Sequence, residues 1–190
     1  MQTTQRGFTL LELIIVIGIL AILGAVSVLV LNPAQLFAQA RDTQRINDLS
    51  TMNSAIGQYL STVTSPDLNG SYADAACATN YYAYATPTTN SFTVARGTAT
   101  VVALRGVTGG AAGWLPVDFS AMTGGSPLSV LPIDPSDTGD YVYRYACDAT
   151  ALTYELDAKL ESTKYSGNMS TDGGDNNSFY EMGTASGLAL

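Results

Sequence analysis

A single carboxylate interrupts the most apolar stretch of this chain. Residues 8–31 read FTLLELIIVIGILAILGAVSVLVL, and Glu12 is their only charged side chain. A charge inside a membrane costs about 2.5–3.5 kcal/mol at the centre of a helix and less near the interface, so such a residue usually has a function and a partner. No Lys or Arg follows Glu12 before Arg41. The partner must therefore come from the chain's own amino end or from another molecule.

The residue types that the chain lacks exclude several kinds of chemistry. It has no histidine, which removes Ser–His–Asp and Cys–His catalysis and every His-ligated metal site. We find no Gly-rich phosphate loop, metalloprotease helix or nucleophile elbow. Carboxylates are plentiful, but the sequence does not say which of them meet in space. We therefore expect no enzymatic activity.

The two cysteines offer redox or structural chemistry. Cys77 and Cys147 lie 70 positions apart, a spacing that disfavours zinc and thioredoxin-type motifs. In an exported protein we expect them to pair, which would stabilise the fold by about 4 kcal/mol in the chain-entropy model. The alternative is two unrelated buried thiols.

An oxygen-rich run near the carboxyl end, residues 171–177, reads TDGGDNN. Calcium takes six to eight oxygens from carboxylates, amides and backbone carbonyls on flexible loops. The spacing differs from that of an EF-hand, and a solvated turn is the alternative. The candidate calcium ligands are Asp172, Asp175, Asn176 and Asn177.

Length and composition suit one domain and an anchoring segment. The chain has 190 residues, of which 46% are hydrophobic and 13% charged, so its composition is not that of a disordered protein. The net charge of −8 argues against nucleic-acid binding by the soluble part, because phosphate contacts need clustered Lys and Arg.

The apolar segment itself allows three interpretations. A helix of 24 residues is about 36 Å long, enough to cross a hydrocarbon core, and Arg6 favours a cytoplasmic amino end. A cleaved signal peptide is supported by Ala38-Gln39-Ala40, but its apolar region is usually only about 7–15 residues long. An ordinary signal anchor is the second interpretation. Neither explains Glu12.

The third interpretation is a resemblance. Gly7-Phe8-Thr9-Leu10-Leu11-Glu12 resembles the class III signal of type IV pilins and type II secretion pseudopilins. The resemblance implies cleavage after Gly7 by a membrane-bound prepilin peptidase, and N-methylation of the new terminus, Phe8. It also implies that Glu12 meets the Phe8 amine of a neighbouring subunit during assembly, which supplies the missing partner.

The same resemblance implies a cell-envelope filament. The subunit would be a single-pass protein of the inner or cytoplasmic membrane with an extracytoplasmic domain, assembled into a periplasmic or cell-surface filament. Its implied partners are other copies of itself, minor pilins, prepilin peptidase, membrane lipid and a complex of assembly ATPase and platform protein. A membrane-anchored extracytoplasmic binding module is the alternative from another functional class.

The chain divides into four predicted segments: a leader at 1–7, an apolar helix at 8–31, an amphipathic helical half at 32–62 and a globular domain at 63–190. Asn32-Pro33 predicts an interruption between the two helical halves. Apolar residues recur at three- and four-residue spacing along the second half, and this face should pack on the globular domain; its members are Ile46, Leu49, Met52, Ile56 and Tyr59. On another face, Arg41 and Arg45 predict either intersubunit salt bridges or a solvated surface.

The globular part predicts an α+β fold, with the long N-terminal helix packed on three or four antiparallel strands. We expect a surface loop over residues 61–90, with tyrosines that pack it on the core, and a loop anchored by Trp114. Alternation predicts strands at 92–96, 99–105, 141–145 and 152–160, the first two as a hairpin.

Some features of the globular part favour a pseudopilin, and others favour a surface pilin. Leu131-Pro132-Ile133-Asp134-Pro135, Tyr141-Val142-Tyr143 and Lys159-Leu160-Glu161-Ser162 resemble major pseudopilins, which also bind calcium in a C-terminal loop rich in Asp and Gly. The predicted disulfide and the long Ser/Thr-rich loop favour a surface pilin for adhesion, motility or DNA uptake. The three segments that resemble major pseudopilins favour a pseudopilin of a type II secretion system.

Overall fold

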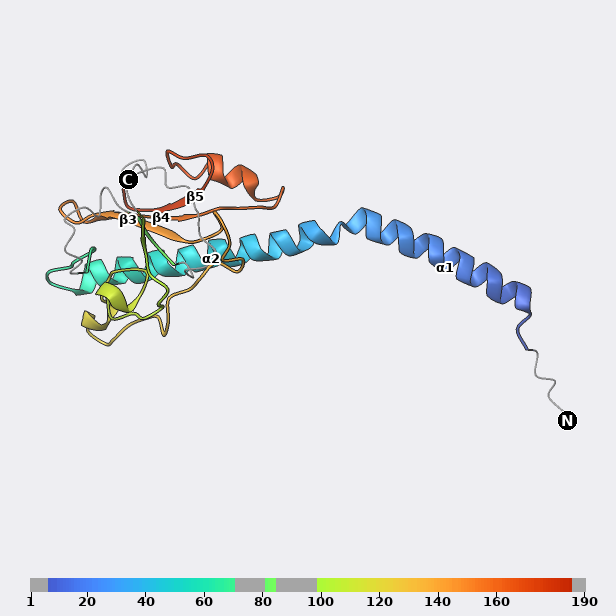
Figure 1. Cartoon of the computed structure of the whole chain (residues 1–190), viewed down its shortest axis with the longest axis horizontal. Coiled ribbons are helices and arrows are strands. Elements are labelled where there is room, and N and C mark those ends of the chain that lie inside the picture. Colours follow the sequence, from blue (N-terminus) through green and yellow to red (C-terminus); the bar gives the residue numbers. More distant parts are fainter. Residues whose placement is uncertain (1–6, 71–80, 85–98, 186–190) are drawn as a thin grey trace. The chain divides into compact units, whose positions relative to one another are not determined.

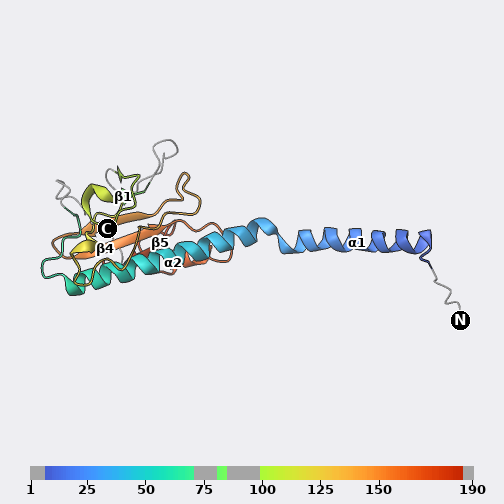
Figure 2. The ribbon, with the colours of Figure 1, turned by 90° about the horizontal axis from the view of Figure 1, so that it is seen from below.

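The computed structural model describes residues 7–70, 81–84 and 99–185. The chain forms two compact units, Met1–Phe37 and Ala38–Leu190, shown in Figures 1 and 2. Each unit is described by itself below.

Helix α1 (Leu10–Leu31) makes up most of the first unit. It ends at Asn32, whose backbone is left-handed with φ 41° and ψ 76°. Asparagine is one of the few residues other than glycine that adopts this conformation readily. Helix α2 (Pro33–Thr62) then begins at a proline, which suits a first helical position because it has no N–H to satisfy there. The interruption lies where the Asn32-Pro33 pair predicts it.

In the second unit, α2 lies along one face of the sheet (Figures 1 and 2). The predicted apolar face is confirmed at Leu49, Met52, Ile56 and Tyr59, which are buried, whereas Ile46 is only half-buried.

Within the described residues, five strands form one sheet in the order β2-β1-β3-β4-β5. The neighbours β1–β3, β3–β4 and β4–β5 are antiparallel, and β2 adds a parallel edge beside β1. The predicted α+β class is therefore confirmed. The strands are β1 (Tyr81–Ala83), β2 (Ala99–Val101), β3 (Arg144–Asp148), β4 (Thr153–Ala158) and β5 (Tyr180–Gly183).

Two strand predictions need correction. The loop expected over 61–90 contains the buried strand β1, because tertiary packing overrides a polar local composition. The strand expected at 141–145 begins only at Arg144, since Tyr141 closes a turn by donating its N–H to the Thr138 carbonyl at 3.0 Å. The predicted strand at 152–160 is confirmed as β4. Residues 92–98 of the predicted hairpin lie outside the described residues, and Ala99–Val101 pairs in parallel with β1.

Two tyrosines, one just before β3 and one in β4, fasten the sheet to α2. The hydroxyl of Tyr143 donates to Asp48 Oδ2 at 2.7 Å, and that of Tyr154 donates to Asn53 Oδ1 at 2.7 Å. Buried tyrosine rings contribute apolar area and a hydroxyl that needs a partner, and here α2 provides it. Trp114 is fully buried and donates its ring N–H to the Pro132 carbonyl at 3.0 Å, which confirms it as the anchor of its loop.

Candidate functional site

The first turn of α1 places the Glu12 carboxylate beside Thr9. Glu12 Oε2 accepts hydrogen bonds from the Thr9 backbone N–H and from the Thr9 hydroxyl, both at 2.8 Å, and Thr9 Oγ1 accepts the Glu12 N–H at 3.3 Å. This is a capping box, in which two otherwise unpaired backbone donors are satisfied reciprocally. Both Thr9 bonds end on Oε2, so among the described residues Oε1 retains its capacity to accept a further donor.

The helix that follows offers no polar face. Its described large apolar side chains are between 48% and 76% exposed, from Val16 to Leu10. A helix that is apolar all round belongs in lipid or in the core of a larger protein assembly. In the described part of the chain, one helical stretch is long and apolar enough to cross a membrane, and it contains α1.

A family model described as the prokaryotic N-terminal methylation motif matches residues 2–28. The chain carries the processing signal of type IV pilins and pseudopilins. The match implies cleavage by prepilin peptidase and polymerisation with other copies of the chain, and together with the apolar α1 it fits a membrane-anchored pilin assembled into a filament. It indicates a structural subunit. Neither a curated protein nor a solved structure matches the chain.

The predicted processing residues lie immediately before α1 of this pilin-like chain. Gly7 is exposed and Phe8 is 89% exposed. Cleavage after Gly7 and methylation of Phe8 stay predictions. Cys77 lies outside the described residues, so its pairing with the buried Cys147 also stays a prediction.

A charged cluster that sequence reasoning missed holds α2 in the globular unit. All five N–H donors of the Arg45 guanidinium are used. They reach Asp134 Oδ2 and Oδ1 at 2.7 and 3.0 Å, Ser136 Oγ at 2.9 Å, Asp42 Oδ1 at 2.8 Å and Glu161 Oε1 at 2.7 Å. The side chains of Arg45, Asp42 and Asp134 are completely buried.

The same cluster includes a second arginine and two backbone donors. Arg41 forms a fork with Glu161, at 2.6 Å to Oε1 and 2.7 Å to Oε2. The Asp42 carboxylate also accepts the backbone N–H groups of Glu161 and Ser162. The Arg41 hydrogen bonds, with those of Arg45, lower the pKa of Glu161 to about 2. For Arg45, which is completely buried and paired within one subunit, both expectations, intersubunit pairing and a solvated face, are wrong. The side chain of Arg41 is 37% exposed, and its pairing with another subunit stays a prediction.

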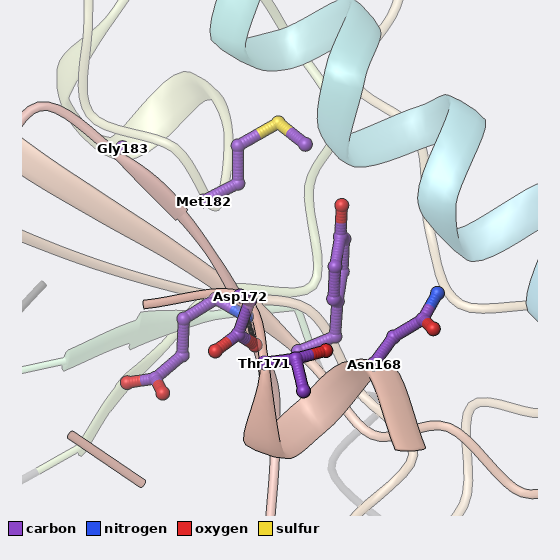
Figure 3. A pocket seen from close by; sticks show the side chains of 7 residues that line it. Asn168, Thr171, Asp172, Met182 and Gly183 are labelled. Atoms are coloured by element: carbon purple, nitrogen blue, oxygen red, sulfur yellow. Dashed lines mark hydrogen bonds between the residues drawn. The ribbon is translucent and has the colours of Figure 1, made fainter. Parts of the chain in front are cut away.

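The predicted calcium ligands form turns in the structure. Asp172 Oδ1 accepts the Gly174 N–H at 3.1 Å and Oδ2 accepts the Glu181 N–H at 2.9 Å, while Asn176 Oδ1 accepts the Ser178 N–H at 3.1 Å. Asp172 also lines an open pocket of about 370 Å³ between the 3-10 helix Ser166–Ser170 and β5 (Figure 3). Calcium at this run stays a prediction.

Proposed function

We propose that the chain is a structural filament subunit that polymerises through α1, with the Glu12 carboxylate paired to the amino terminus of a neighbouring subunit. The observation that carries the proposal is the combination of an all-apolar helix with one charge in its first turn. An ion pair gains most where solvent screens it least. Intrinsic catalysis forms no part of this proposal.

Within this class, we propose a pseudopilin of a type II secretion system. Support comes from Asp134 and Glu161, which belong to the segments that resemble major pseudopilins and which meet on Arg45. Minor pilins, the assembly ATPase and the platform protein are the partners that this role requires. A surface pilin is the second candidate, and the predicted Cys77–Cys147 bridge favours it.

The capping box makes a sharp test of Glu12 possible. Glutamine also serves at the third position of a capping box, so Glu12→Gln removes the charge and retains the local helix start. Thr9→Ala is the matched control, because it removes the cap, which costs about 1 kcal/mol, and retains the charge. We expect both variants to insert in the membrane, and only Glu12→Gln to lose filaments in an electron-microscopy and shearing assay.

Normal filaments from Glu12→Gln would contradict the proposed ion pair. Mass spectrometry of the mature chain should find N-methyl-Phe8 as the first residue, and retention of Met1 would exclude the pilin-like reading. Deletion of the chain from its host separates the two finer roles. A pseudopilin deletion abolishes release of secreted enzymes into the medium, whereas a pilin deletion removes surface fibres.

A further inference from the structure

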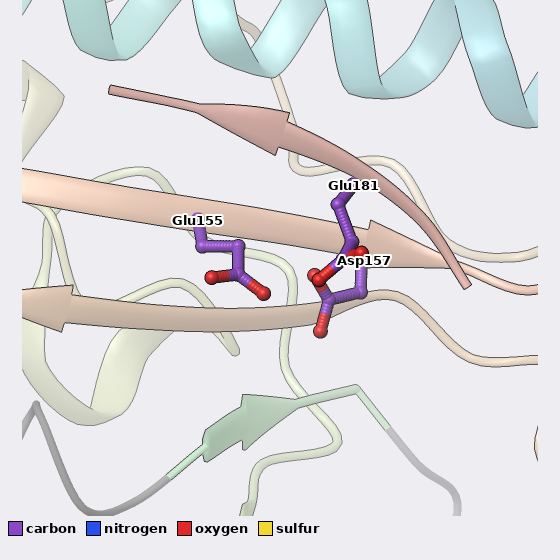
Figure 4. Close-up of side chains that lie close together, drawn as sticks. All are labelled: Glu155, Asp157 and Glu181. Atoms are coloured by element: carbon purple, nitrogen blue, oxygen red, sulfur yellow. The ribbon is translucent and has the colours of Figure 1, made fainter. Parts of the chain in front are cut away.

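Three carboxylates converge on the face of the sheet opposite α2. Asp157 on β4 is the register partner of Glu181 on β5, and Glu155 precedes Asp157 by two positions, so all three side chains lie on one face. One oxygen from each lies within 4.8 Å of the others. The three residues are only 2–5% exposed. Figure 4 shows them gathered across the two strands.

This arrangement is electrostatically costly on its own. The facing cation is Arg144, the register partner of Asp157 on β3, which also contacts Asp140 at 3.5 Å and the Phe179 ring at 4.0 Å. Among the residues that the structure describes here, one guanidinium against three carboxylates leaves a negative excess in a region of low dielectric.

A second observation points to a ligand. Asp157 Oδ1 is buried, and among the described residues it has no hydrogen-bond partner. Buried polar atoms in native proteins almost always have a partner, whether from protein, water or ion. This orphaned acceptor belongs to the middle member of the cluster.

The loop after the 3-10 helix covers Glu181. The Asn176 backbone N–H donates to Glu181 Oε2 at 3.0 Å, and a Cβ at Gly174 would lie 1.9 Å from the same oxygen. A side chain at position 174 would require the Glu181 carboxylate to shift. The Asp172 oxygens already accept backbone N–H groups, so the strands offer better-placed ligands than the loop does.

We propose that Glu155, Asp157 and Glu181 bind a divalent cation of the hard, oxygen-preferring class, with calcium as the best fit. Carboxylate-only ligation disfavours zinc and copper, which prefer nitrogen or sulfur. Calcium accepts irregular geometry with Ca–O distances of about 2.3–2.6 Å, which suits oxygens spread up to 4.8 Å apart. Magnesium demands a near-ideal octahedron. The ion would neutralise the cluster and join β4, β5 and the covering loop.

The test uses the full chain in detergent with calcium chloride as the probe. Titration calorimetry measures binding, and the fluorescence of Trp114, the single tryptophan, reports melting of the globular unit. We expect one ion per chain with a Kd of about 10⁻⁴–10⁻³ M, typical of extracellular modules. Calcium should raise the Tm, and EDTA should reverse the rise.

Isosteric variants decide where the ion binds. Glu181→Gln and Asp157→Asn should each weaken calcium binding at least tenfold, yet in EDTA they should melt no lower than wild type, since each removes a buried charge. Asp148→Asn makes the same charge change at the far end of β3 and should bind normally. Asn177→Ala should also bind normally. Wild type without calcium binding, Glu181→Gln with undiminished binding, or loss of binding in Asn177→Ala would each overturn the proposal.

Discussion

Replacement of Arg45 by methionine tests whether the charged cluster holds α2 in place. Methionine fills similar length but provides none of the five donors that reach Asp42, Asp134, Ser136 and Glu161. Two completely buried carboxylates, Asp42 and Asp134, would then lose their cation. Breaking a buried ion pair by removal of one partner costs about 3–5 kcal/mol. That is a large part of the total of about 5–15 kcal/mol that stabilises a typical domain.

The assay is urea unfolding of the full chain in detergent, followed by the fluorescence of Trp114. Because this single tryptophan is buried in the globular unit, the signal does not report on α1. With a urea slope of about 2 kcal/mol per molar, we expect the midpoint to fall by about 2 M. An unchanged slope would show that the loss is one of stability and not of cooperativity.

Two matched variants isolate the reason for that loss. Arg45→Lys retains the charge but loses the planar fork, and should lie between wild type and Arg45→Met. Arg41→Met removes the outer arginine, whose side chain is 37% exposed, and should cost at most about 1 kcal/mol. If Arg45→Met loses no more than Arg41→Met, the buried cluster contributes little and our reasoning is wrong.

Two further predictions concern contacts between α2 and the rest of the globular unit. The depressed pKa of Glu161, about 2 against a usual 4.5, means that its contribution is fully present above about pH 5 and is lost as the pH falls from 4.5 towards 2. We expect the free energy of unfolding to fall by about 2 kcal/mol over this pH range, after allowance for solvent screening. The Glu161→Gln variant should lack this pH-dependent loss, and identical pH profiles for the variant and wild type would refute the prediction. Tyr143→Phe removes the donor to Asp48 and should lower the free energy of unfolding by about 1.5–3 kcal/mol, as for hydrogen bonds to charged groups. An equal loss in Asp48→Asn and in the double variant would confirm that the two side chains are coupled. Additive losses would contradict the coupling.

The sequence predicts most of α1 and α2 because their signals are local. An unbroken apolar run and an Asn-Pro pair predict a helix and its end without any knowledge of tertiary contacts. The capping box was missed even though Thr9 and Glu12 have the S/T-x-x-E spacing that predicts it. The carboxylate of Glu12 therefore has a local role in starting α1 as well as a charge that needs a partner in lipid.

Strands β1 and β5 could not be predicted in the same way. They have three and four residues, too few to show a clear period of two. β5 also follows a run rich in Gly, Asp and Asn, which reads as a turn. Their strand character comes from pairing with β3 and β4, which is a property of the folded chain.

The two charged clusters were missed for a related reason. Arg45 lies 89 positions from Asp134 and 116 from Glu161, and no local pattern connects them. Glu155 and Asp157 alternate with Tyr154 and Leu156, a pattern typical of a solvated strand face. Only the register with β5 brings Glu181 beside them, and all three carboxylates are buried in the folded chain.

The Arg45 cluster lies near the start of α2 within the globular unit, which begins at Ala38. The next turns hold Asp42 and Arg45, before the apolar face that includes Leu49. Apolar packing is non-directional, whereas four of the five hydrogen bonds of Arg45 join α2 to two separate segments of the globular unit. The cluster therefore fixes the position of α2 along its own axis, which apolar packing alone does not.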